Sequence, residues 1–177
     1  MKKLFATLLL TGLLAGLSNA KPLVAYFSAT GNTERLARTA AKTLNADLFE
    51  IVPEQKYTNA DLDWTDKKSR TTLESNDKKA RPAIKNKVEL AQYDSVVVAF
   101  PIWWYTAPKI IYTFMESYDF GGKKIVLLCT SGGSGLGRTS SDLQKVTNPK
   151  ADIRNGKCLS PDAGESEIRK VIEKALR

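Results

Sequence analysis

The chain has 177 residues, of which 42% are hydrophobic and 26% are charged, and its formal net charge at pH 7 is +8. This composition is typical of one globular domain and excludes disordered, collagenous and multi-span membrane proteins. The sequence contains no histidine and only two cysteines. It therefore excludes His-based zinc sites, Ser-His-Asp hydrolysis and Cys₄ metal centres, and we expect no metal site.

The first twenty residues follow the three-part pattern of a secretory signal peptide. A short positive segment (residues 1–3) precedes a mostly apolar, uncharged stretch (residues 4–17), and small residues lead to a cleavage point after Ala20. The apolar stretch is shorter than the roughly 20 residues that a spanning helix needs, which disfavours the alternative of an uncleaved membrane anchor. We expect export to the periplasm or the exterior, without stable membrane insertion, and one mature domain over residues 21–177.

The remaining chain alternates between strand-like and helix-like patterns. In chain order these are a strand at 23–27, a helix at 34–44, a strand at 48–52, a strand at 95–100, a helix from Pro108 through Met115, a strand at 124–130, a helix at 138–146, a strand at 151–159 and a helix at 165–176. Strands separated by helices indicate a parallel sheet with right-handed crossovers, so we expect a three-layer α/β/α sandwich.

One segment, from Pro53 to Pro82, does not fit this alternation. It is polar and charged, and it is too long for an ordinary loop of an α/β unit. We expect it to hold one surface helix around residues 60–76. Its basic residues are interleaved with acidic ones, which indicates a solvated face and no nucleic-acid partner.

Ligands of open parallel sheets bind at the carboxyl ends of the strands, so the loops that follow the strands are informative. After the first strand, residues 28–33 combine three hydroxyl side chains, one amide and one glycine at the start of a helix. A glycine allows a tight turn, and the free N–H groups of a helix start attract an anion. This loop predicts a phosphate site; the simpler alternative is an ordinary helix cap.

Two further loops follow the third and fourth strands. Residues 101–108 contain three adjacent aromatic side chains, of which Trp103 fits a core position and Trp104 or Tyr105 suits stacking on a planar ring. Residues 131–137 contain four glycines, whose exposed backbone can bond the polar edge of a heterocycle. The alternative for this second loop is a flexible glycine linker.

Together, the segments "YFSATGNT", "FPIWWYTAP" and "CTSGGSGLG" resemble the motifs of the flavodoxin-like family. The resemblance spans the chain from residue 23 to the C-terminus. It implies a five-stranded parallel sheet in the order 2-1-3-4-5 and FMN as the cofactor. Long-studied flavodoxins are acidic cytoplasmic electron shuttles, whereas this chain is basic and carries an export pattern.

The resemblance implies three groups of FMN contacts: residues 28–33 at the phosphate, residues 101–105 around the isoalloxazine ring, and residues 130–135 at its pyrimidine and N5 edge. In full, these residues are Ser28, Ala29, Thr30, Gly31, Asn32, Thr33, Pro101, Ile102, Trp103, Trp104, Tyr105, Thr130, Ser131, Gly132, Gly133, Ser134 and Gly135. No catalytic residue is identified.

The implied strand order makes Cys129 and Cys158 neighbours at the ends of the fourth and fifth strands. An oxidising compartment favours a disulfide. Bridging directly adjacent parallel strands is geometrically awkward, however, so we expect two buried thiols and keep the disulfide as the alternative.

Three functions remain open on this scaffold. The first is an electron carrier outside the cytoplasm, which exchanges electrons with a redox partner protein or a small-molecule acceptor. The second is an FMN-dependent reductase of quinones or similar small acceptors, using NAD(P)H or another donor. The third is a non-redox binding module. The three loops contain no residue suited to acid–base catalysis, which favours the carrier.

Overall fold

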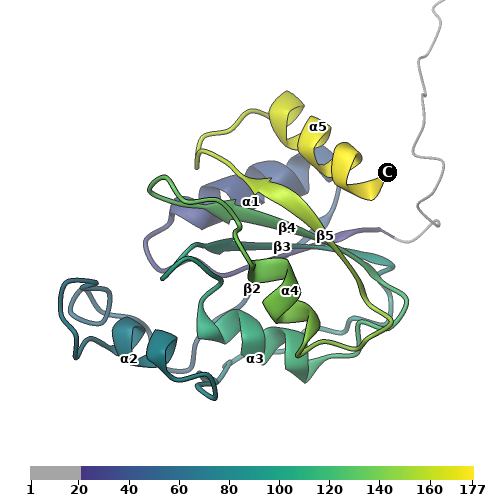
Figure 1. The fold of residues 1–177 in the computed structure, drawn as a ribbon. Coiled ribbons are helices and arrows are strands. Elements are labelled where there is room, and N and C mark those ends of the chain that lie inside the picture. Colours follow the sequence, from purple (N-terminus) through teal and green to yellow (C-terminus); the bar gives the residue numbers. More distant parts are fainter. Residues whose placement is uncertain (1–20) are drawn as a thin grey trace, which may run out of the picture.

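The computed structural model describes residues 21–177, so the predicted signal peptide lies outside the described residues. A five-stranded parallel sheet in the order β2-β1-β3-β4-β5 forms the middle layer, which confirms the predicted topology (Figure 1). The elements are β1 (Leu23–Tyr26), α1 (Asn32–Leu44), β2 (Asp47–Glu50), α2 (Arg70–Asn76), β3 (Ser95–Pro101), α3 (Lys109–Ser117), β4 (Lys124–Thr130), α4 (Thr139–Gln144), β5 (Asp152–Cys158) and α5 (Glu165–Leu176).

The central strands are buried on both faces because helices cover each side of the sheet. Along β3, Val96, Val98 and Phe100 pack into the apolar cluster that contains the buried residues of α3 and α4. Val97 and Ala99 point the other way, into the cluster formed with α1 and α5. This alternation follows from the two-residue period of a strand. In the described part of the chain, no helix is long and apolar enough to cross a bilayer.

The polar segment between Pro53 and Pro82 holds less helix than its sequence predicts. The helix α2 begins only at Arg70, where the side chain of Ser69 caps it by accepting a hydrogen bond from the backbone N–H of Thr72. The preceding residues form turns in which Asp side chains accept backbone N–H groups, as Asp61 does from Thr58. Such local bonds compete with helix formation, so the predicted helix over 60–76 was too long.

The same segment is anchored to the domain through Tyr57. The hydroxyl of Tyr57 donates to Glu74 at 2.8 Å, and the guanidinium of Arg70 lies 4.0 Å from the centre of its ring. The ring also makes edge contacts with Phe27 and Trp103. Burial, reinforced by the Glu74 carboxylate, raises the pKa of Tyr57 well above its usual range, so its hydroxyl stays protonated. Tyr57 therefore joins the segment to the central sheet.

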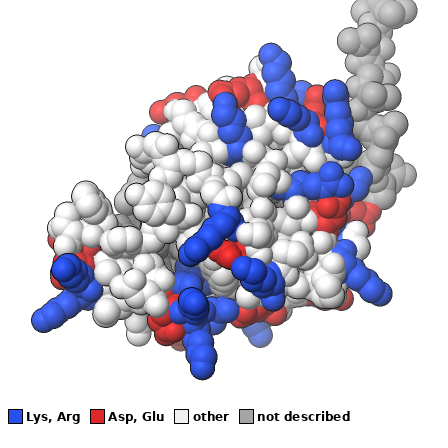
Figure 2. Space-filling model, viewed as in Figure 1, with Lys and Arg blue, Asp and Glu red and all other residues white. Residues whose placement is uncertain are grey.

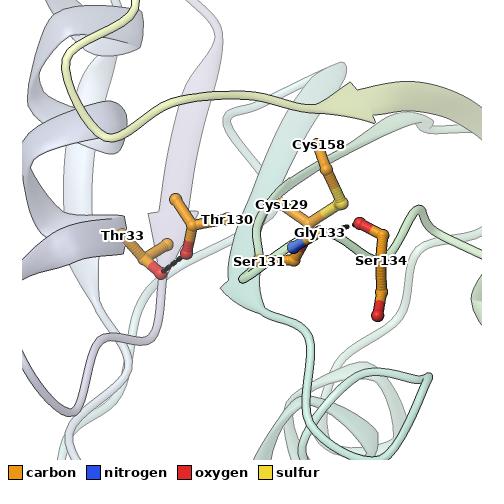
Figure 3. The surroundings of a disulfide bond; sticks show 7 residues. All are labelled: Thr33, Cys129, Thr130, Ser131, Gly133, Ser134 and Cys158. Atoms are coloured by element: carbon orange, nitrogen blue, oxygen red, sulfur yellow. Dashed lines mark hydrogen bonds between the residues drawn. A yellow bond between two sulfur atoms is a disulfide. The ribbon is translucent and has the colours of Figure 1, made fainter.

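The two cysteines form a disulfide, so the expectation of two buried thiols is wrong (Figure 3). The pairing of β4 with β5 shifts by one residue after Leu127, which brings Cys158 directly opposite Cys129. Gly156 lies in the shifted stretch, and a Cβ at this position would stand 2.4 Å from the carbonyl oxygen of Leu127. An irregularity of this kind re-aims side chains locally, and here it makes a bridge between adjacent parallel strands possible.

Candidate functional site

The loops at the carboxyl ends of β1, β3 and β4 enclose a cavity of about 650 Å³. They lie along the left-hand edge of the sheet in Figure 1, close to α2. All but three of the predicted contact residues line this cavity: Ser28, Ala29, Thr30, Asn32, Thr33, Pro101, Ile102, Trp103, Trp104, Tyr105, Thr130, Ser131, Gly132 and Ser134. The exceptions, Gly31, Gly133 and Gly135, belong to the same loops but are not among the lining residues.

The first loop presents the uncapped start of α1 to the cavity. Gly31 precedes the helix with a φ of 86°, a left-handed conformation that suits glycine, and no side chain caps the helix. The N–H groups of residues 32–34 find no acceptor within residues 21–177. Free N–H groups at the positive end of a helix dipole bind anions, and the exposed Thr30 and Asn32 add polar side chains.

The hydroxyl of Thr33 has a different environment from that of Thr30. It is buried and lies 2.8 Å from the hydroxyl of Thr130 at the end of β4 (Figure 3). This hydrogen bond joins the first loop to the third across the floor of the site. Thr33 therefore positions the loops, whereas Thr30 is exposed to the cavity.

The second loop is a tight turn with two aromatic residues in a strained conformation. Trp103 and Thr106 exchange two backbone hydrogen bonds of 3.0 and 3.1 Å, so Trp104 and Tyr105 occupy the turn. Both have left-handed φ angles, 52° and 62°, which cost a non-glycine residue roughly 1–2 kcal/mol each. Glycine or asparagine usually fills such positions. Strain of this kind clusters at binding and active sites, so Trp104 and Tyr105 are candidates for contact with a ligand.

This turn places the three aromatic side chains at different depths in the molecule. Trp103 packs inward, with its ring 5.4 Å from that of Phe27 and 5.2 Å from that of Tyr57, as its predicted core position requires. Trp104 and Tyr105 remain 41% and 77% exposed while lining the cavity. The exposed rings therefore border the mouth of the cavity, and the inner ring supports the turn.

The glycine-rich third loop is organised by Ser131 and by contact with the aromatic turn. The Ser131 hydroxyl donates to the Ser134 carbonyl and accepts the N–H of Gly133 (Figure 3). Farther along, Gly137 has a φ of 53°, and a Cβ there would lie 3.2 Å from the carbonyl of Tyr105. The loop is therefore a defined turn packed against the second loop, which argues against a flexible linker.

Four lining residues were not predicted: Leu62, Trp64, Thr71 and Pro161. The first three come from the segment between Pro53 and Pro82, which thereby forms one wall of the site. Trp64 is 73% exposed. The few large apolar residues of this polar segment, Leu62 and Trp64 among them, were the available signal for this wall. Which of them reach the cavity depends on how the segment folds back against the domain.

The cavity contains no Asp, Glu, Lys or Arg among its lining residues in the described chain. Its donors are backbone N–H groups and hydroxyls, and its walls are aromatic and apolar. Cofactor sites have volumes of roughly 300–1,000 Å³ and a few convergent polar groups. Helix-start donors for a phosphate, aromatic walls for a planar ring and a serine–glycine loop for a polar edge fit FMN. The individual contacts remain predictions.

The family model named flavodoxin matches residues 21–175. A crystal structure of a Bacteroides eggerthii protein assigned to the flavoproteins shares 44% identity over 90% of this chain and 99% of its own, with a TM-score of 0.84. A similar Bacteroides uniformis protein shares 43% identity over 88% and 99%, with a TM-score of 0.81. A flavoprotein from Lactobacillus acidophilus in complex with FMN shares the fold at 19% identity over 86% and 99%, with a TM-score of 0.63.

Among curated proteins, no significant match was found. The family match covers nearly all of the described residues, and the site has the features that an FMN cofactor requires. The chain belongs to the flavodoxin family of FMN-binding redox proteins, as its three loop motifs predict.

Proposed function

We propose that this protein is an FMN-dependent electron carrier that works outside the cytoplasm. The observation that carries the proposal is the uncharged cavity formed by three strand-end loops. Because the described residues that line the cavity offer hydrogen-bond donors and aromatic walls but no carboxylate, lysine or histidine, the cavity suits electron transfer better than proton transfer to a substrate. When bound, FMN supplies the ability to accept and release electrons singly or in pairs.

Residues of the three loops would contact different parts of the cofactor. The helix-start N–H groups and the Thr30 hydroxyl would bind the phosphate, and Ser131 would hold the loop that faces the polar edge of the ring. Trp103 and Trp104 would line the space for the ring and exclude water from it. Tyr105, at the exposed mouth, would meet an approaching redox partner.

Two features support work outside the cytoplasm. Disulfides persist in oxidising compartments and are rare in the cytosol, and Cys129 and Cys158 are paired. The family match begins at residue 21, directly after the predicted signal peptide. Expression of the full chain in a Gram-negative host tests this point: we expect periplasmic protein that lacks residues 1–20 and holds no free thiol. Cytoplasmic protein that retains residues 1–20 would contradict export.

Binding of FMN is tested by titrating the flavin-free protein and following flavin fluorescence. The variant Thr30→Ala should weaken FMN affinity roughly tenfold to hundredfold, since a hydrogen bond to a charged group contributes about 1.5–3 kcal/mol. The matched control is Thr39→Ala, because Thr39 lies farther along α1 and its hydroxyl bonds only the Arg35 carbonyl. Wild-type affinity in Thr30→Ala would argue against the assigned phosphate site.

A reductase of small acceptors is the second candidate, favoured by one observation. A separate cavity of about 600 Å³ borders the flavin cavity at Trp104, and a substrate has room to bind there. Rapid oxidation of NAD(P)H by the FMN-loaded protein in the presence of a quinone would establish the reductase. We expect the carrier instead: slow NAD(P)H oxidation, but fast exchange with a reduced protein donor.

A further inference from the structure

The separate cavity is strongly basic, in contrast to the uncharged flavin cavity beside it. Five cationic side chains and one carboxylate line it: Lys78, Arg81, Lys109, Arg138, Lys145 and Asp142. In Figure 2, Lys and Arg side chains gather around a small acidic area in the lower middle of the face, where Figure 1 shows α2, α3 and α4 converging.

Carboxylates only partly neutralise these cations. Asp142 accepts from Arg138 at 3.0 Å and from Lys145 at 2.9 Å, so one negative charge serves two positive ones. Arg81 is held by Glu116 through two bonds of 2.6 and 2.7 Å. Within residues 21–177, the remaining two lysines of the cavity, at positions 78 and 109, have no carboxylate within ion-pair distance.

Lys109 is the cation of this cavity whose side chain is mostly buried and which has no carboxylate partner in the described chain. It is only 9% exposed, it lines the cavity, and its ammonium group lies 4.8 Å from the centre of the Tyr112 ring. Its ammonium donates no hydrogen bond to an acceptor within the described chain. It is also the first residue of α3, where the positive end of the helix dipole disfavours a cation.

Two effects oppose the charge on Lys109. Burial lowers the pKa of the Lys109 ammonium, and the neighbouring charge of Arg81 lowers it further; the carboxylates of Asp77 and Asp142 raise it by less, so the pKa is lowered overall. A partly desolvated ammonium that faces a cavity without an ion-pair partner is unfavourable, and an opposite charge in the cavity would compensate it. An anion in the cavity would supply that charge and would also gain from the exposed Lys78 and Arg138.

We propose that this basic cavity binds a small ligand that carries a phosphate or carboxylate group, with the buried Lys109 and the exposed Lys78 as its main cationic contacts. Because Trp104 borders both cavities, the rest of such a ligand lies next to the flavin site. A redox role for the ligand rests on the proposed function, whereas anion binding itself does not.

The test is calorimetric titration of the FMN-loaded protein with pyrophosphate and, separately, with citrate. Loading with FMN matters because its phosphate would occupy the site predicted at the start of α1. We expect one equivalent of anion to bind and Lys109→Gln to weaken the binding at least about tenfold, the effect of losing a charge-assisted contact. The matched control Lys170→Gln removes the same charge from an exposed position on α5 and should bind like the wild type. Preference for pyrophosphate or for citrate assigns the ligand to the phosphates or to the carboxylates.

Absence of binding to either anion at millimolar concentration overturns the proposal, and so does equal affinity in the wild type and Lys109→Gln. If Lys109→Gln fails to fold, Lys78→Gln replaces it, since Lys78 is exposed and its side chain holds no other element in place. FMN affinity should be unchanged in both variants. A wild type that binds no FMN would refute the proposed function, while Lys109-dependent pyrophosphate binding by that flavin-free protein would still support the anion site.

Discussion

Removal of the Cys129–Cys158 disulfide should destabilise the protein by about 3.6 kcal/mol at 25 °C. The cysteines are 29 residues apart in the sequence. Closing a loop of that length lowers the entropy of the unfolded chain by about 12 cal/mol/K, from which the free energy follows. Domains of this size lose about 2–4 °C in Tm per kcal/mol, so the melting temperature should fall by about 7–14 °C.

The assay is urea unfolding of the wild type and of the double variant Cys129→Ala/Cys158→Ala, each with and without a reductant. Alanine is preferred to serine because Cys129 is fully buried, and a serine hydroxyl would lack a hydrogen-bond partner there. We expect the reductant to lower the unfolding free energy of the wild type nearly to that of the double variant. The double variant itself should not respond to the reductant.

Two results would refute this reasoning. Equal unfolding free energies of the wild type with and without reductant would mean that the bond does not constrain the unfolded chain. Two titratable thiols in the unfolded, non-reduced wild type would mean that the bond is absent, as the sequence had suggested.

Three further changes probe the loops and the surface. Thr33→Val leaves the buried hydroxyl of Thr130 unpaired and should cost about 1–3 kcal/mol in urea unfolding, and the double variant Thr33→Val/Thr130→Val should recover most of that loss. Tyr105→Asn relieves a left-handed conformation and should raise stability by about 1 kcal/mol while FMN affinity falls; a less stable variant contradicts the assigned strain. Arg81 lowers the pKa of Glu116, so their pair stabilises the fold at neutral pH, and this contribution disappears as pH falls through the lowered pKa. Glu116→Gln should therefore be less stable at pH 7, by up to about 1 kcal/mol, and the difference should vanish in acid; a pH-independent difference argues against the pair.

The sequence alone determined the strands and the helices between them, and its resemblance to the flavodoxin-like family supplied the strand order. Short apolar runs such as the one in β3 predict the strands, because a strand that is buried on both faces consists of continuous hydrophobic residues. The three loops that line the cavity were found for a related reason: parallel strands all end at one edge, so motifs far apart in the chain converge there. Residues such as Thr30 and Trp104 could therefore be assigned to one cavity before its shape was known.

Only the tertiary structure decided the features that depend on contacts between distant segments. The shifted pairing around Gly156 brings the cysteines together, and no local pattern in either strand encodes that shift. The wall containing Trp64 exists because Tyr57 anchors a polar segment whose own sequence lacks a clear period. The basic cavity around Lys109 gathers charges from three helices and their connections. Each of these features arises from packing between segments that are far apart in the sequence. The hydrophobic periodicity of one segment carries no information about such contacts.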